Sequence, residues 1–276
     1  MKGMGILLWI LTGVYLIILL CCCSRIRLGI AIMEATSDFV RDVMSIFMVP
    51  IIFLFILAVW LAFWVVSAIY VFSVGKAYQL GRIEWNNTTR YVWIYHLFGL
   101  FWISAFIIGC AQFIIAATAC IWYFSQGGNS DDKSKASLRV GFKWIFKYHM
   151  GSIAFGALII AIMQMIKIAF EYMRKKYEKL IPNNPVTKCI ICCLRCCIWC
   201  LDYFVKFITK NAYIQIALTS KSFCPAAWAT FCLIVRNCAR FTIISGIGAI
   251  LMFVGKALII AISGWISYLI IMNSSL

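Results

Sequence analysis

Long uncharged apolar runs constrain this chain more than any other feature of its sequence. Residues 5–23, 46–74 and 95–124 contain no Asp, Glu, Lys or Arg. A helix needs about 20 such residues to cross the roughly 30 Å of bilayer hydrocarbon. Because 64% of the residues are hydrophobic and only 12% are charged, a soluble globular domain is excluded. We therefore predict an all-α polytopic membrane protein, a bundle of about 5–7 transmembrane helices plus an amphipathic interfacial helix.

The same hydropathy pattern predicts one transmembrane domain, residues 1–276. A helix over 26–43 would place Arg27, Glu34, Asp38 and Arg41 on one face, which indicates an amphipathic helix at the membrane surface, with a solvated connector as the alternative. Lys167, near the end of its span, is expected to reach the interface. The predicted spans are 5–23, 46–74, 95–124, 149–170 and 242–271, and an uncertain span or re-entrant segment lies within 189–235.

The net charge of +16 indicates contact with anionic lipid headgroups, because no soluble basic domain is present to bind nucleic acid. Overlapping acceptor sequons begin at Asn86 and Asn87, and their glycosylation would place that loop outside the membrane. The distribution of Lys and Arg mildly favours the opposite orientation. These two signals conflict, so the sequence leaves the orientation open.

Cysteines gather at the boundaries between apolar and basic stretches. This position indicates structural or S-acylated thiols, whereas the repeated Cys-x-x-Cys spacing of residues 189–200 also permits a zinc site or a redox role. A helix would string these thiols along a stripe, which is poor geometry for a tetrahedral metal, so we predict no metal site. The lipidation candidates are Cys21, Cys22, Cys23, Cys189, Cys192 and Cys193.

Catalytic signals are absent from the sequence. It contains no phosphate-binding glycine loop, metalloprotease helix or serine-elbow motif. Its two histidines, His96 and His149, lie at the ends of predicted spans, and its few acidic residues lie near membrane boundaries. We expect neither enzyme activity nor a cofactor.

Aromatic side chains inside the spans supply ring faces that attract a quaternary ammonium. Interfacial belts and helix packing are the competing explanation for these residues. The cation–π candidates are Trp60, Trp64, Tyr70, Tyr95, Trp102 and Tyr123.

Several blocks together resemble the choline transporter-like protein family. They include Arg25–Ile32, Tyr95–Trp102 with Gln112, and Tyr148–Ile159. Further matches are the cysteine block through Asp202, Asn211–Ile214, Phe223-Cys224, Arg236-Asn237 and Gly255-Lys256. The blocks keep the family's order and rough spacing over about residues 5–262.

The resemblance implies a helical transporter of choline or an ethanolamine-like amine, at the plasma membrane or, as the alternative, an organelle membrane. It also implies that residues 25–42 are cytoplasmic, and it adds weight to the aromatic candidates and Gln112 as substrate contacts. Family members are longer, and this chain resembles their later spans, with Asp202 where Glu is usual. The alternative is therefore a truncated, non-transporting subunit or scaffold, either a homo-oligomer or a partner of a full-length relative.

Overall fold

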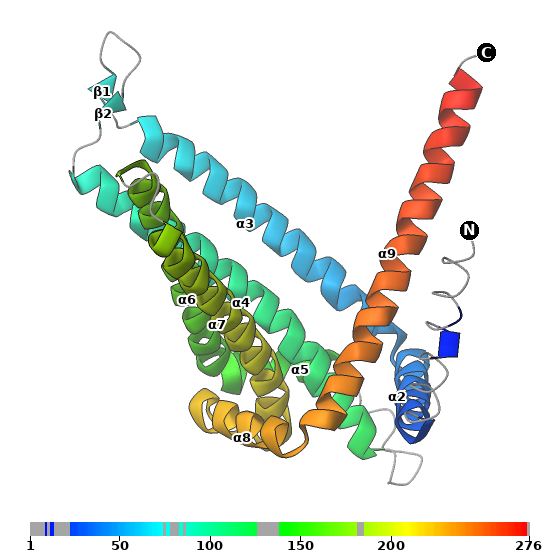
Figure 1. Cartoon of the computed structure of the whole chain (residues 1–276). Coiled ribbons are helices and arrows are strands. Elements are labelled where there is room, and N and C mark those ends of the chain that lie inside the picture. Colours follow the sequence, from blue (N-terminus) through cyan, green and yellow to red (C-terminus); the bar gives the residue numbers. More distant parts are fainter. Residues whose placement is uncertain are drawn as a thin grey trace. The chain divides into compact units, whose positions relative to one another are not determined.

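Helices account for nearly all of the chain that the computed structural model describes (Figure 1). The described residues are 9, 12–13, 23–73, 76–77, 83–84, 87–125, 138–180 and 185–274. One short antiparallel ladder, β1 (Lys76–Ala77) with β2 (Ile83–Glu84), lies in the connection between two long helices. The prediction of an all-α polytopic membrane protein is confirmed.

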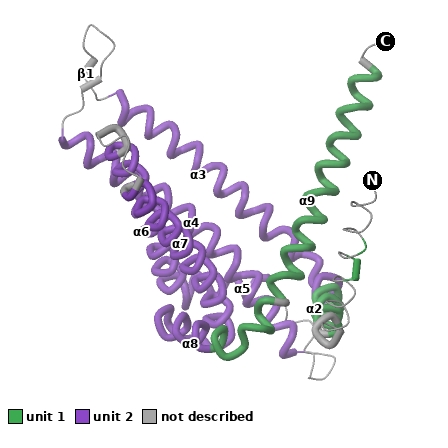
Figure 2. The backbone as a smooth tube through the Cα atoms, viewed as in Figure 1, with its two compact units in different colours: residues 1–38, 233–276 green, residues 39–232 purple. Residues whose placement is uncertain are grey.

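The chain forms two compact units (Figure 2). Unit 1 comprises residues 1–38 and 233–276, and unit 2 comprises residues 39–232. Most of helix α2 (Cys23–Asp42) belongs to unit 1, and its last four residues belong to unit 2. Helix α9 (Cys238–Ser274) lies wholly in unit 1. Gly29 of α2 lies directly against the side chain of Ile247 on α9, where any larger residue would overlap that side chain.

Unit 2 is a bundle in which α4 (Asn87–Ser125) packs along three other long helices: α3 (Met48–Ser73), α6 (Met150–Leu180) and α7 (Pro185–Thr219). The 3-10 turn η1 (Met44–Phe47) leads into α3. Helix α5 (Leu138–Trp144) and the π-helical turn η3 (Ile145–His149) lead into α6. Helix α8 (Phe223–Arg236) follows α7 after a short connection. Helices α6 and α7 also contact each other, so α4, α6 and α7 form the core of the unit.

Small residues in the core of unit 2 allow its helices to pack closely against one another. Tyr213 of α7 is almost fully buried, and its hydroxyl donates a hydrogen bond of 3.2 Å to the backbone carbonyl of Ile153 on α6. Gly109 of α4 and Gly156 of α6 lie against this tyrosine. Because lipid is as apolar as a hydrophobic side chain, such close packing and interhelical hydrogen bonds stabilise a membrane bundle more than apolar burial does.

Four described helical segments are long and apolar enough to cross a membrane: Met44–Ser73, Asn87–Ser125, Leu138–Tyr177 and Cys238–Asn273. They overlap the predicted spans 46–74, 95–124, 149–170 and 242–271. Large apolar side chains such as Phe55 and Phe63 on α3, and Ile260 on α9, are exposed, as expected for surfaces that face lipid. The crossings themselves remain predictions, and almost all of the predicted first span, 5–23, lies outside the described residues.

The two segments that the sequence left open are both helical. Residues 26–43 fall almost entirely within α2, and residues 189–235 divide between α7 and the 14-residue α8. The surface location of the first segment and the membrane path of the second remain predictions.

Replacement of Gly156 by Ala is expected to destabilise unit 2. A Cβ atom there would lie 2.6 Å from Phe223 and 2.7 Å from the Tyr213 hydroxyl, too close for either to remain in place. Overpacking of this kind costs about 1–3 kcal/mol. Thermal unfolding of the purified protein in detergent should therefore begin at a lower temperature.

Gly151→Ala is the matched control, because it lies on the same helix and a Cβ atom there would meet nothing within 4 Å. Equal melting temperatures for the two variants would contradict the packing role assigned to Gly156.

Candidate functional site

A cavity of about 540 Å³ lies where η3 and the start of α6 meet the connection between α7 and α8. Its volume falls in the ~300–1,000 Å³ range of small-molecule sites. One side is formed by Trp144, Tyr148, His149 and Ser152, and the other by Ser220, Lys221 and Ser222. All of these residues belong to unit 2.

Local backbone geometry creates both sides of the cavity. On one side, the π-helical turn inserts an extra residue into the helix between Trp144 and Met150, a device common at functional sites. On the other side, Ser220 has a φ of 55°, in the left-handed region that non-glycine residues rarely adopt. Its N–H donates to the carbonyl of Ile216 at 2.8 Å and so ends α7. The chain then turns, which places Lys221 and Ser222 along the cavity.

The lining of the cavity combines aromatic rings with hydroxyl groups. Trp144 and Tyr148 are aromatic residues of the lining, while Ser152, Ser220 and Ser222 are its hydroxyl-bearing residues. The ammonium nitrogen of Lys147 already lies 5.4 Å from the centre of the Tyr148 ring, in cation–π range. His149 is buried, with its ring 5.4 Å from that of Phe113. The lining thus combines aromatic residues and hydroxyl groups with one cation, Lys221.

The sequence-predicted aromatic residues lie elsewhere, along α3 and α4, and the structure does not gather them into one cage. Tyr70, Tyr95 and Tyr123 are exposed, and Gln112 is half-buried. Trp102 donates its indole N–H to the carbonyl of Ala154 at 3.0 Å, which ties α4 to α6. These residues stay predictions as substrate contacts.

Trp64 is the predicted residue with the most extensive aromatic packing. Its ring stacks on His96 with centroids 4.9 Å apart, and Trp93 packs edge-on against both rings. The Trp64 indole donates to the His96 carbonyl at 3.1 Å, and the His96 ring lies 3.3 Å from the Trp64 carbonyl. This reciprocal pair joins α3 to α4. Trp60, one turn earlier, has a buried indole nitrogen without a hydrogen-bond partner among the described residues.

Some of the predicted glycosylation and lipidation sites lie in the described part of the chain, and others lie outside it. Asn87 begins α4, whereas Asn86, Cys21 and Cys22 lie outside the described residues. Cys23 begins α2. Cys189, Cys192 and Cys193 are exposed free thiols on α7. Among the residues that the structure describes, no group of three or more His, Cys, Asp or Glu side chains is placed to hold a metal ion.

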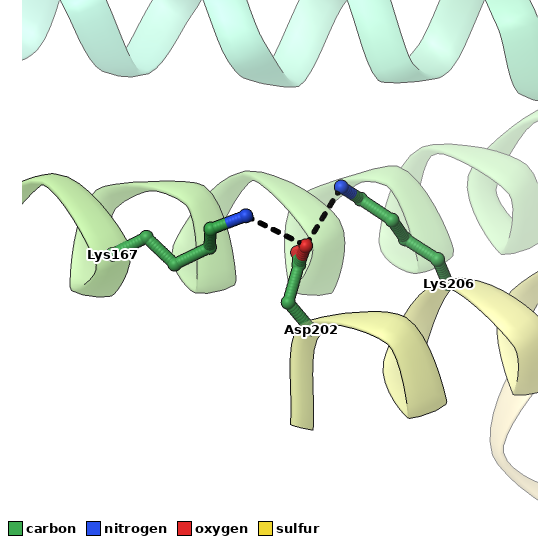
Figure 3. A network of polar contacts seen from close by, with 3 residues as sticks. All are labelled: Lys167, Asp202 and Lys206. Carbon is green, nitrogen blue, oxygen red and sulfur yellow. Dashed lines mark hydrogen bonds and ion pairs between the residues drawn. The ribbon is translucent and has the colours of Figure 1, made fainter. Parts of the chain in front are cut away.

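A polar network between α6 and α7 was not anticipated from the sequence (Figure 3). Asp202 is only 6% exposed, and its Oδ2 accepts hydrogen bonds from Lys167 at 2.8 Å and from Lys206 at 3.0 Å. The Lys167 ammonium also lies 5.0 Å from the centre of the Trp199 ring. Lys167 therefore pairs with a carboxylate and an aromatic face on the neighbouring helix.

Loss of Asp202 alone is expected to destabilise the protein, because Lys167 would keep a partly buried charge without its carboxylate. Breaking a buried ion pair on one side costs about 3–5 kcal/mol, and the partial exposure of Lys167 favours the lower end. Asp202→Leu should therefore lower the free energy of unfolding, measured by denaturant titration in mixed micelles.

The double variant Lys167→Met/Asp202→Leu should recover most of this loss, since it removes both charges. Lys206→Met should have a smaller effect, because the Lys206 side chain is 43% exposed and Asp202 would keep Lys167. A double variant no more stable than Asp202→Leu would refute the pairing argument.

Comparison with known proteins places these features in a family context. A family model described as plasma-membrane choline transporter matches residues 6–275. Choline transporter-like protein 2 of Dictyostelium discoideum is 32% identical over 274 residues, which cover 97% of this chain and 43% of that protein. Choline transporter-like protein 4 of Rattus norvegicus is 30% identical over 304 residues, with 95% of this chain and 43% of the relative covered.

A third relative, choline transporter-like protein 5-B of Danio rerio, is 29% identical over 290 residues. The match covers 91% of this chain and 41% of that protein. The chain thus spans less than half the length of these relatives. Tyr148, His149 and Ser152 of the cavity belong to one of the blocks that carry the resemblance, and this placement is the sequence signal that could have pointed to them.

Proposed function

The chain belongs to the plasma-membrane choline transporter family, and from that premise we propose that it takes part in moving choline or a related small amine across a membrane. It is an integral, multi-pass membrane protein. The observation that carries the proposal is the cavity of Trp144, Tyr148 and Ser152, whose chemistry matches this class of substrate.

Choline presents two groups that the cavity can recognise. Its trimethylammonium cannot donate a conventional N–H hydrogen bond, so aromatic faces such as Trp144 and Tyr148 are its natural partners. Its hydroxyl can exchange hydrogen bonds with Ser152, Ser220 or Ser222. An ethanolamine-like amine would use the same hydroxyl contacts and also donate N–H bonds.

Lys221 opposes this binding, because it places a positive charge on the cavity wall. The residue is exposed on the connection between α7 and α8, so its side chain can extend into solvent. We propose that its position tunes the affinity for the cation.

We also propose that the residues predicted from the sequence contact the substrate. A path along α3 and α4 would be lined by Trp60, Trp64, Tyr70, Tyr95, Trp102, Tyr123 and Gln112. The plasma membrane is the proposed location, with membrane lipids and a second copy or a longer relative as proposed partners. Glycosylation at Asn86 or Asn87 would place the loop that holds them outside.

Choline binding to the purified chain in nanodiscs tests the site directly. Tyr148→Ala and Trp144→Ala should each weaken the affinity about tenfold, the equivalent of a desolvated cation–π contact. Lys221→Gln should strengthen it about threefold by removing a like charge. Isothermal titration calorimetry with choline chloride measures all three effects.

Trp265→Ala is the matched control, because Trp265 is an exposed aromatic residue on α9 that does not line the cavity. Unchanged affinity in the Tyr148 and Trp144 variants would remove this cavity from the proposal. Labelled choline flux into liposomes then separates a transporting chain from one that binds choline without moving it.

A further inference from the structure

The N-terminal part of α7 carries a dense row of accessible thiols. Six cysteines occur within twelve residues, and all six are free and exposed: Cys189, Cys192, Cys193, Cys196, Cys197 and Cys200. At 100° per residue, Cys189, Cys193, Cys196 and Cys200 form one stripe along the helix, and the other two flank it. From Cys189 to Cys200 the helix advances about 17 Å.

The residues around these cysteines match a membrane–water boundary. Ile190, Leu194 and Trp199 are exposed apolar side chains, and Lys188 and Arg195 are exposed cations. Exposed apolar and basic residues together are typical of a helical segment that lies in the headgroup region. Cys189 lies twelve residues after Tyr177, the last residue of the candidate span Leu138–Tyr177, and the row is not part of any of the four candidate spans.

The geometry argues against the other uses of clustered cysteines. A metal ion requires ligands that converge on a point, but these thiols are spread along a helix face, and the described residues contain no group placed to hold a metal. All six are unpaired, so the row does not serve as a disulfide framework. What remains is a row of free, exposed thiols.

We propose that this row, Cys189–Cys200, lies on the cytoplasmic side, the orientation that the distribution of Lys and Arg favours over the sequons, and is a site of S-acylation by long-chain fatty acids. In the reaction a cysteine sulfur forms a thioester bond to the acyl carbonyl of a long-chain acyl-CoA. The acyl-CoA thioester breaks, and coenzyme A leaves as a free thiol with the proton from the cysteine. Because single acyl chains bind membranes reversibly, several on one stripe would hold this segment firmly at the membrane surface.

Anchoring here would act on the α6–α7 pair. Asp202, which joins α7 to α6 through Lys167, lies two residues beyond Cys200. Acyl chains on the preceding turns would therefore fix the depth of α7 relative to the bilayer close to the Lys167–Asp202 ion pair. This inference does not depend on the choice of transported substrate.

The test is acyl exchange on the full chain expressed in eukaryotic cells. Free thiols are blocked with N-ethylmaleimide, thioesters are cleaved with neutral hydroxylamine, and the released thiols are labelled with a polyethylene-glycol maleimide. Each acyl group then adds one gel shift. The chain used carries Cys21→Ser, Cys22→Ser and Cys23→Ser, so that signals from the first cysteine cluster are absent.

We expect hydroxylamine-dependent shifts that disappear when the six α7 cysteines are changed to serine. The shifts should persist in a control with Cys224→Ser, Cys232→Ser and Cys238→Ser, which lie outside the row. Absence of any shift, or shifts that survive in the six-serine variant, overturns the proposal.

Peptide mass spectrometry of the unaltered chain gives an independent answer if the six-serine variant fails to fold. Trypsin cuts after Lys188, Arg195 and Lys206, which separates Cys189–Cys193 from Cys196–Cys200. Hydroxylamine-sensitive acyl mass on either peptide supports the proposal, and recovery of both peptides with only free thiols overturns it.

Discussion

The close approach of α4, α6 and α7 around Tyr213 is the constraint on which the rest of unit 2 depends. Gly109 and Gly156 remove the side chains that would otherwise hold the helices apart, and the Tyr213 hydroxyl reaches the backbone of α6 because of that space. Helices brought this near also place Lys167 within hydrogen-bonding distance of Asp202. The same packing places the connection between α7 and α8 beside the start of α6, where the cavity lies.

Much of the architecture could be predicted because hydropathy is a local property. The apolar runs over residues 46–74 and 95–124 specify helices without reference to any neighbour, and the described helices overlap them. The break between α7 and α8 could not be placed in the same way. It depends on a serine in the left-handed conformation at Ser220, and a serine gives no sequence signal for such a turn.

The candidate site was much less accessible to sequence reasoning. The cavity joins Ser152 to Lys221, and the ion pair joins Lys167 to Asp202, so each depends on how α6 packs against distant residues. The sequence shows that Lys167 is charged and lies near the end of an apolar run, but it does not show which helix packs beside it. The aromatic residues that the sequence indicates as substrate contacts lie on α3 and α4, away from the cavity. There Trp64 packs against His96.

The π-helical turn η3 has a mechanical consequence for the cavity. A π turn holds one residue more than an α-helical turn, and each residue of an α-helix rotates the following side chains by about 100°. If η3 tightened into a regular α-helix, Trp144 and Ser152 could not both keep their present directions. One face of the cavity would have to rotate away from the other, or α6 would have to turn Gly156 away from Tyr213. The shape of the cavity and the packing of the bundle are therefore set by the same five residues, Ile145–His149.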